Sequence, residues 1–239
     1  HPDWLGPDDL AIKIEQLREA TEWRVPIHVK LGACRVGDDV KLAAKAGADA
    51  VVVDSMVAGT GASAEVLLDH SGIPTVPAIV MAREALREVG LYGKVSLIAS
   101  GGIRSGADAA KALALGADAV AIGISALIAL NCNKEISESD FMTEVGVPAG
   151  QCRHCHTGKC PVGITTQNPE LTKRLDPDEG AERVANFINS MTMEMALLTR
   201  SLGKGDVHSL EPEDLAALTI EASAMAQIPL AGTSKVFGE

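Results

Sequence analysis

The stretch KVSLIASGGIRSGADAAKALALGADAVAIG, residues 94–123, carries a complete strand–helix–strand pattern. Residues 94–100 and 116–123 are short apolar runs, which are typical of buried parallel strands. A glycine-rich turn at residues 101–106 separates the first run from a helix expected over residues 107–115. The stretch therefore predicts an α/β fold in which parallel strands alternate with helices.

A weak internal repeat extends this pattern toward the N-terminus. Residues 43–54, AAKAGADAVVVD, resemble residues 112–123, ALALGADAVAIG, since each has a helix end, a glycine and an Ala-Asp-Ala-Val strand. Such self-similarity suits the repeated β/α units of a barrel. Strands covered on both faces are expected over residues 27–32, 48–54, 94–100 and 116–123. Helices are expected over residues 8–22, 38–46, 64–71, 79–89, 107–115 and 124–130.

The composition changes after about residue 131. Residues 1–131 carry the β/α units, residues 132–180 form a cysteine-rich cluster loop, and residues 181–239 form a helical C-terminal appendix. Beyond the β/α units we expect a polar connection over residues 133–144, an extended stretch to residue 177, helices over 177–202 and 212–225, and a disordered tail over 232–239.

The number of strands sets a limit on the architecture. An eight-stranded barrel typically takes about 250 residues by itself. Four parallel strands cannot close into such a barrel, and their two edges would stay unpaired. We therefore expect the C-terminal half of a TIM (β/α)8 barrel, with its N-terminal half missing from this chain or supplied by a partner.

Charge and composition exclude several classes of partner. The 239 residues include 21 Lys and Arg against 32 Asp and Glu, a formal net charge of −11. This balance argues against a nucleic-acid partner or an anionic membrane surface. No apolar stretch reaches the length of a membrane span, and no signal peptide is visible at the start. The five cysteines do not suggest a disulfide scaffold, so we expect a reduced, cytoplasmic protein. We also expect the protein to be an oligomer.

The turn at residues 100–106 predicts a phosphate site. A phosphate needs several N–H donors directed at one point, and Gly101 and Gly102 let the backbone come close while the following helix adds its dipole. In barrels of this kind, phosphate sites frequently use the loops after strands seven and eight. The last two expected strands end at Ser100 and just before Gly123. The alternative is that these glycines only make tight turns.

Other polar residues follow the expected strands at the same edge. Lys30 ends the first strand, where its ammonium would meet an anionic ring system or a carboxylate; the alternative is a solvated lysine at the rim. Thr60 and Ser63 lie in the loop after the second strand, where the signal is weak without context.

Three thiols fall within nine residues, at Cys152, Cys155 and Cys160. Thiolates at this spacing can converge on one soft metal centre. An iron–sulfur cluster with three cysteine ligands, completed by Cys132, is one possibility. Zinc with His154 or His156 is another, and surface thiols without metal are the third. The spacing favours a metal but does not choose between iron and zinc.

Three motifs occur in the same order in the FMN-binding domain of glutamate synthases. The stretches that resemble them are AGTGAS at 58–63, SGGIRSG at 100–106 and CHTGKCPVGITTQ at 155–167. VKL at 29–31 and NPELTKRL at 168–175 are also similar to family segments. The resemblance covers about residues 1–180 and looks most like the stand-alone or archaeal-type FMN subunits, which include relatives that make N-methylglutamate from methylamine.

The resemblance implies an oxidoreductase that carries out a reductive amination. Family members bind FMN and a [3Fe-4S] cluster, and their electrons come from a ferredoxin or a pyridine-nucleotide reductase. Ammonia, released from glutamine by an amidotransferase domain or subunit, adds to 2-oxoglutarate. Reduced FMN then delivers hydride to 2-iminoglutarate, giving glutamate.

The resemblance also implies roles for individual residues. The cofactor-binding set would be Lys30, Thr60, Ser63, Ser100, Gly101, Gly102 and Gly123, with the glycines holding the FMN phosphate. A dicarboxylic substrate needs cationic partners, and Lys30, Arg35 and Arg104 are the catalytic candidates. Cys155 and Cys160 would ligate the cluster.

Two departures from the family pattern leave alternatives open. The third cluster ligand is either Cys152 or Cys132, and four ligands with a [4Fe-4S] cluster are a further alternative. The loop at residues 32–35 reads GACR, so the exact oxo acid is open. Two other hypotheses are a barrel that binds a nucleotide or sugar phosphate, and a non-catalytic fragment of an FMN barrel.

Overall fold

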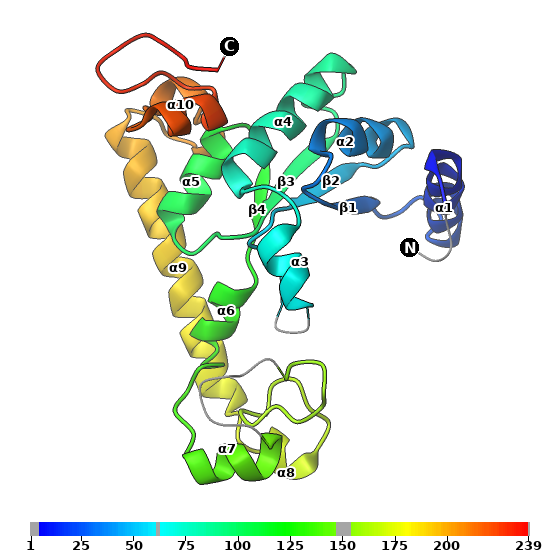
Figure 1. Ribbon diagram of the computed structural model, residues 1–239, viewed down its shortest axis with the longest axis vertical. Helices are drawn as coiled ribbons and strands as arrows, with labels where there is room; N and C mark the ends of the chain where they lie inside the picture. The colour runs from blue at the N-terminus through cyan, green and yellow to red at the C-terminus, as the bar shows by residue number, and fades with distance from the viewer. Residues whose placement is uncertain (1–4, 61–62, 147–153, 239) are drawn as a thin grey trace.

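The computed structural model describes residues 5–60, 63–146 and 154–238. At its centre lies a four-stranded sheet in the order β1-β2-β3-β4 (Figure 1). Neighbouring strands are all parallel. The strands are β1 (His28–Gly32), β2 (Ala50–Asp54), β3 (Ser96–Ser100) and β4 (Ala119–Ala121). The predicted α/β class and the four expected strands are confirmed.

Helices connect the strands and form the rest of the chain. Those of the β/α units are α1 (Pro7–Ala20), α2 (Val36–Lys45), α3 (Glu65–His70), α4 (Thr75–Glu88), α5 (Gly106–Ala114) and α6 (Ile124–Ala129). Those that follow are α7 (Glu138–Val145), α8 (Pro169–Thr172), α9 (Pro177–Ser201), the 3-10 helices η1 (Val207–Ser209) and η2 (Pro212–Asp214), and α10 (Ile220–Ala226). Helix α4 begins four residues before the expected start, because a proline in the first turn of a helix is tolerated.

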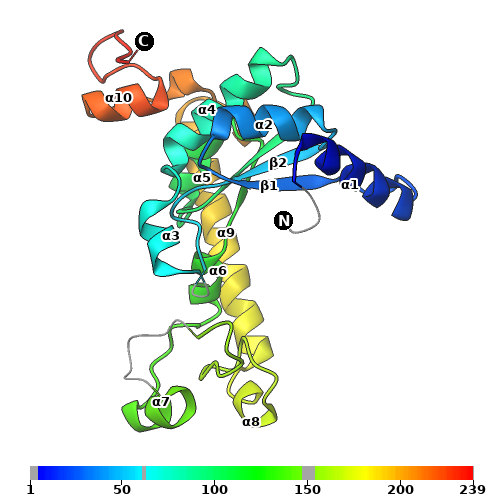
Figure 2. The ribbon, with the colours of Figure 1, turned by 45° about the vertical axis from the view of Figure 1, so that its right-hand side comes forward.

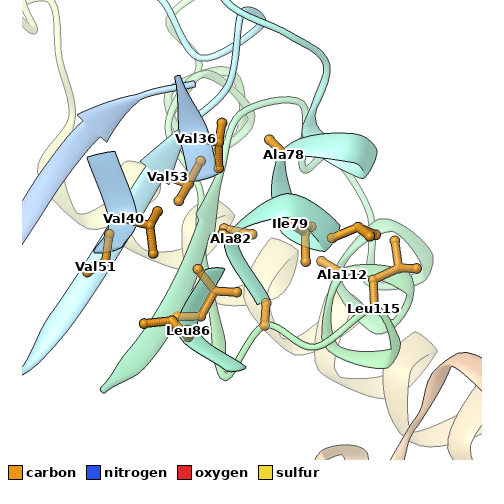
Figure 3. Close-up of a cluster of buried hydrophobic side chains, with 14 of the residues drawn as sticks. Val36, Val40, Val51, Val53, Ala78, Ile79, Ala82, Leu86, Ala112 and Leu115 are labelled. Carbon is orange, nitrogen blue, oxygen red and sulfur yellow. The ribbon is translucent and has the colours of Figure 1, made fainter. Parts of the chain in front are cut away.

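One face of the sheet forms the core. Val51 and Val53 of β2 and Leu97 of β3 are buried in a single apolar cluster with residues of α2 and α4. Figure 3 shows Val40 of α2 and Leu86 of α4 on the helical side of this cluster. Strand residues two apart share a face, so these strands bury the same face against the helices.

The opposite face of the sheet is not buried in this way. His28, Lys30 and Ser96, which alternate with the core residues, are exposed. The expectation that both faces of every strand are covered is therefore wrong for the described residues. The reason is local: His28 and Lys30 of β1 and Ser96 and Ser100 of β3 place polar side chains on this face, although Ile98 between the two serines is apolar.

The internal repeat corresponds to a repeated hydrogen-bond pattern. Asp49 Oδ2 accepts from the backbone N–H of Ile27 at 2.7 Å, and Asp118 Oδ2 accepts from that of Leu97 at 2.7 Å. Each aspartate thereby joins the start of one strand to the strand before it. A hydrogen bond from Arg18 and the one from Ile27 hold the pKa of Asp49 below its ordinary value.

Helix α9 links the sheet to the cysteine-rich segment. It runs beside α5 and α6 and continues to the end of the molecule that holds α7 and α8 (Figure 1, Figure 2). Gly106 makes close packing between α5 and α9 possible, because a Cβ atom there would lie 2.2 Å from the carbonyl oxygen of Met191. None of the described helices is both long enough and apolar enough to cross a membrane.

Several expectations for the second half of the chain are wrong. The polar connection over 133–144 contains α7, which Ser137 caps by accepting from the N–H of Asp140. The extended stretch before residue 177 contains α8, capped in the same way by Asn168. A serine or asparagine immediately before an acidic turn is a helix-start signal, and it explains both helices.

The end of the chain also differs from its prediction. The single helix expected over 212–225 is divided into η2 and α10, because residues between them form a parallel bridge from Ala217 to Leu230. The tail expected to be disordered folds back as far as it is described. Phe237 N–H donates to Ser223 Oγ at 3.2 Å, and Leu230 N–H donates to the Lys235 carbonyl at 2.9 Å.

We expect Leu86→Ala to lower the free energy of unfolding by about 2–5 kcal/mol, since it opens a cavity in the core. Leu86 has no exposed surface, whereas Met81 on the same helix is 44% exposed. Met81→Ala should therefore change stability by no more than about 0.5 kcal/mol. Urea unfolding followed by circular dichroism measures both, and equal losses would contradict the packing described.

Candidate functional site

The carboxyl ends of the four strands meet at one edge of the sheet. Gly32 at the end of β1 pairs with Asp54 of β2, which in turn pairs with Ser100 of β3. Ser100 pairs with Ala121 at the end of β4. The described candidate residues for cofactor and substrate lie near these ends or in the loops that follow. Open α/β sheets bind their ligands at this edge.

Asp54 joins two of the candidate residues. Lys30 Nζ lies 3.2 Å from Asp54 Oδ2, and Ser100 Oγ donates to Asp54 Oδ1 at 2.5 Å. The Lys30 side chain is 64% exposed, so the pair adds little stability and mainly orients the ammonium. Asp54 was not among the site residues predicted from the sequence. A single charged residue that ends an apolar strand is the signal that would have identified it.

Gly101 is required by packing around it. Its φ is +105°, and a Cβ atom there would lie 2.2 Å from Ser55 Oγ. Thr75 Oγ1 donates to the Gly101 carbonyl at 2.8 Å and lies 2.7 Å from Ser55 Oγ, so the start of α4 holds this turn. Gly102, also left-handed with φ +71°, is exposed. For Gly101 the tight-turn explanation is sufficient.

The N-terminus of α5 already has acceptors from the protein. Gly106 N–H donates to Glu194 Oε2 of α9 at 2.7 Å, and Arg104 N–H donates to Asp108 Oδ2 at 3.0 Å. Asp108 N–H in turn donates to Ser105 Oγ at 3.2 Å. Glu194 and the side chains of this turn thus occupy the N–H groups of Arg104, Gly106 and Asp108, and the contribution of the helix dipole to a phosphate site stays a prediction.

The open donors lie slightly earlier in the turn and at the start of α6. The N–H groups of Gly102 and Ile103 have no acceptor among the described residues. Helix α6 begins after Gly123 without a side-chain cap. Ser125 Oγ donates to the Ile103 carbonyl at 3.0 Å, which brings the two loops together. No atom lies within 4 Å of a Cβ placed on Gly123, so packing does not require glycine there.

The remaining candidates are less closely associated. Thr60 and Ser63 bond each other, with Thr60 N–H donating to Ser63 Oγ at 3.2 Å. Arg35 is the N-cap residue of α2 and is exposed. In the described part of the chain, Lys30 pairs with Asp54, whereas no ion pair joins Arg35 or Arg104 to that carboxylate. The three predicted cations thus lie near the same ends of the strands without sharing a carboxylate.

The cysteine-rich segment is described in part. Cys152 lies outside the described residues. Cys160 is buried, and Cys132 and Cys155 are half-buried. Among residues 5–60, 63–146 and 154–238, no three His, Cys, Asp or Glu side chains gather closely enough to hold a metal ion.

Cys160 nevertheless lies in a setting that suits a thiolate. Burial alone raises the pKa of its thiol, but hydrogen bonds from the N–H groups of Thr165, Ile164 and Val162 lower it further than burial raises it. Thr165 Oγ1 is buried and has no hydrogen-bond partner in the described structure, so it is free to serve a charged sulfur.

Comparison with known proteins covers both the carboxyl ends of the strands and the cysteine-rich segment. A family model described as the conserved region in glutamate synthase matches residues 1–205. The chain belongs to the glutamate synthase family. The resemblance seen in the motifs of this sequence is thereby confirmed.

Individual glutamate synthases extend well beyond this chain. A glutamate synthase large subunit-like protein of Rhizobium meliloti is 55% identical over 98% of this chain and 53% of its own length. An archaeal glutamate synthase [NADPH] of Methanocaldococcus jannaschii is 44% identical over 88% of this chain and 38% of its own length. A solved flavocytochrome b2 with pyruvate bound matches 84% of this chain and 36% of that one, at 22% identity and a TM-score of 0.49. The chain thus spans about half the length, or less, of the two glutamate synthase relatives.

Alanine substitutions at Gly101 and Gly123 should change the stability of the protein by different amounts. Gly101→Ala forces a left-handed alanine against Ser55 and should cost about 1–3 kcal/mol of stability. Gly123→Ala meets open space and should cost no more than about 0.5 kcal/mol. Thermal unfolding of the two variants, without added ligand, makes the comparison; a larger loss at Gly123 would contradict the geometry.

The pKa of the Cys160 thiol should lie below its ordinary value of 9.0, because N–H donors favour the thiolate. Alkylation of the metal-free protein across a pH series, with the Cys160 peptide followed by mass spectrometry, gives the midpoint. Thr165→Val removes one donor and should raise that midpoint. An unchanged midpoint in the variant would show that the hydroxyl does not act on the sulfur.

Proposed function

We propose that this chain provides the FMN-phosphate site and the iron–sulfur segment of a glutamate-synthase-type oxidoreductase. The reaction would be the reductive amination of 2-oxoglutarate, or a related oxo acid, to glutamate. The observation that carries the proposal is the match of residues 1–205 to the family's conserved region, with the candidate loops at one edge of a parallel sheet. N-methylglutamate formation from methylamine is the alternative within the same chemistry.

The architecture proposed is the C-terminal half of a TIM barrel. The exposed face of the sheet, with Lys30 at its carboxyl end, would then point toward the barrel interior. β1 and β4 are the outer strands, and further strands would pair with them. The greater length of the relatives is compatible with such a second half.

The residues present fit an FMN phosphate at the loops after β3 and β4. The open N–H groups of Gly102 and Ile103 lie in the loop that Ser125 of α6 contacts, α6 begins without a side-chain cap, and Gly123 leaves space for the phosphate to approach. Ser100 and Gly101 would shape the turn beneath it. Thr60 and Ser63 would border the flavin pocket.

Lys30 would meet the flavin ring or the carboxylate of the oxo acid. Its ion pair with Asp54 keeps the ammonium at the edge without burying it. Arg35 and Arg104 would bind the second carboxylate of the substrate once it spans the edge. When bound, FMN would supply the hydride and an iron–sulfur cluster would supply the electrons.

The cluster proposed is [3Fe-4S] or [4Fe-4S]. Cys155 and Cys160 would be ligands, with Cys152, Cys132 or both completing the set. The N–H groups directed at Cys160 and the unpartnered Thr165 hydroxyl support a charged sulfur centre at this position. The electron donor would be a ferredoxin or a pyridine-nucleotide reductase, and a glutamine amidotransferase subunit or domain would supply ammonia. We place the enzyme in the cytoplasm, as an oligomer.

An absorption spectrum with metal analysis tests the cofactors. The protein, purified without oxygen and reconstituted with FMN, iron and sulfide, should show flavin and iron–sulfur absorbance together. Zinc in place of iron would reject the cluster. A colourless protein after reconstitution would support a non-catalytic fragment instead. Supplying 2-oxoglutarate, a chemical reductant and either ammonia or methylamine then distinguishes glutamate from N-methylglutamate formation.

Gly123→Ala should weaken FMN binding about tenfold or more while leaving stability nearly unchanged, because its methyl group would occupy the space of the phosphate. Quenching of flavin fluorescence on titration measures the affinity. Riboflavin, which lacks the phosphate, serves as the control ligand and should bind both proteins alike. Equal FMN affinity in the variant would place the phosphate elsewhere.

A further inference from the structure

A polar cavity lies at the amino ends of the strands. It has a volume of about 450 Å³, is partly open to solvent, and is lined by residues of α4, α5, η1 and η2 and by Gln227, which follows α10. Tyr92 and Asp118, which line it, precede β3 and β4, so it borders the amino ends of these strands. Figure 1 shows α10 beside α4. None of the candidate cofactor residues lines it.

Arg83 forms a fixed part of the cavity wall. The residue is only 5% exposed; its Nε donates to Glu84 Oε1 at 2.9 Å and its Nη1 to the Leu115 carbonyl at 3.0 Å. A Cβ on Gly116 would lie 2.6 Å from Arg83 Cδ, so this glycine makes room for the side chain. Nη2 has no protein acceptor in the described structure, and Thr165 Oγ1 is the one buried polar atom recorded there without a partner. Nη2 is therefore open to the cavity.

The wall formed by α4 carries excess positive charge. Arg87 Nη1 also donates to Glu84 Oε1, at 2.9 Å, and the Arg87 guanidinium lies 5.0 Å from the centre of the Tyr92 ring. Two guanidinium groups therefore share one carboxylate, which leaves α4 with one excess positive charge, beside Asp118, whose carboxylate accepts from the Leu97 N–H and also lines the cavity. Tyr92 and the buried Arg83 fix the position of this charge, which makes it a preorganised partner for a carboxylate.

The facing segment carries excess negative charge. Lys204 Nζ bonds Glu211 Oε1 at 2.9 Å and Asp214 Oδ2 at 2.5 Å, so two carboxylates share one ammonium. Glu213 lines the cavity and has no ion pair or hydrogen bond in the described part of the chain. A simple anion would be attracted by one wall and repelled by the other.

We propose that this cavity binds a free amino acid. The α-carboxylate would bond Arg83 Nη2 and Arg87, and the α-ammonium would meet Glu213 and Glu211. The volume of about 450 Å³ lies within the range of small-molecule sites and leaves room for a side chain and water. The inference does not depend on the proposed function, since no residue of the carboxyl edge takes part.

Titration calorimetry on the full chain tests this, with L-glutamate and L-glutamine as probes. Glutarate, which is glutamate without its ammonium group, is the matched control ligand. Both amino acids should bind with one site per chain, and glutarate about tenfold or more weaker, since it loses a charge-assisted hydrogen bond.

Variants locate the binding. Arg87→Gln and Glu213→Gln, both at the rim, should each weaken amino-acid binding about tenfold or more. Glu182→Gln, an exposed change on α9, should leave it unchanged. Circular dichroism confirms that each variant is folded. Equal binding of glutarate, undiminished binding in both rim variants, or no binding at millimolar amino acid would each overturn the proposal.

Discussion

The in-register parallel pairing of the four strands is the constraint on which the rest of the structure depends. Pairing of Gly32, Asp54 and Ser100 across neighbouring strands brings three loops to one edge. The same pairing brings Asp49 and Asp118 to the other edge, where each bonds the start of the preceding strand. The sheet thus differs chemically between the carboxyl ends and the amino ends of its strands. The loops after the strands surround the carboxyl ends, and the C-terminal helices cover the amino ends.

Glycines near the carboxyl ends of the strands serve different purposes. Gly101 is needed because Ser55 and a left-handed backbone leave no room for a side chain. Gly106 is needed because α9 packs against it. Gly123 has neither requirement, and the space beside it is open. A glycine that packing does not explain is a stronger indication of a ligand than one that packing requires.

Local patterns in the sequence were sufficient for the strands, most helices and the edge at which the candidate residues gather. Apolar runs such as 48–54 and 94–100 identify buried strands because burial is set by neighbouring residues. Local sequence patterns do not predict contacts between residues that are far apart in the sequence. Glu194, 88 positions from Gly106 in the sequence, accepts from the N–H of Gly106 at the start of α5. Asp54 comes within reach of Lys30 and Ser100 only once the strands pair. The bridge that divides the helix expected over 212–225 is likewise a tertiary contact.

The central claim is that the loops after β3 and β4 hold the phosphate of FMN. A crystal structure of the protein reconstituted with FMN tests it most directly. We expect phosphate oxygens to accept from the N–H groups of Gly102 and Ile103 and from the first turn of α6, with Gly106 still bonded to Glu194. A phosphate bound at Gly106 in place of Glu194, or at another edge of the sheet, would contradict the account.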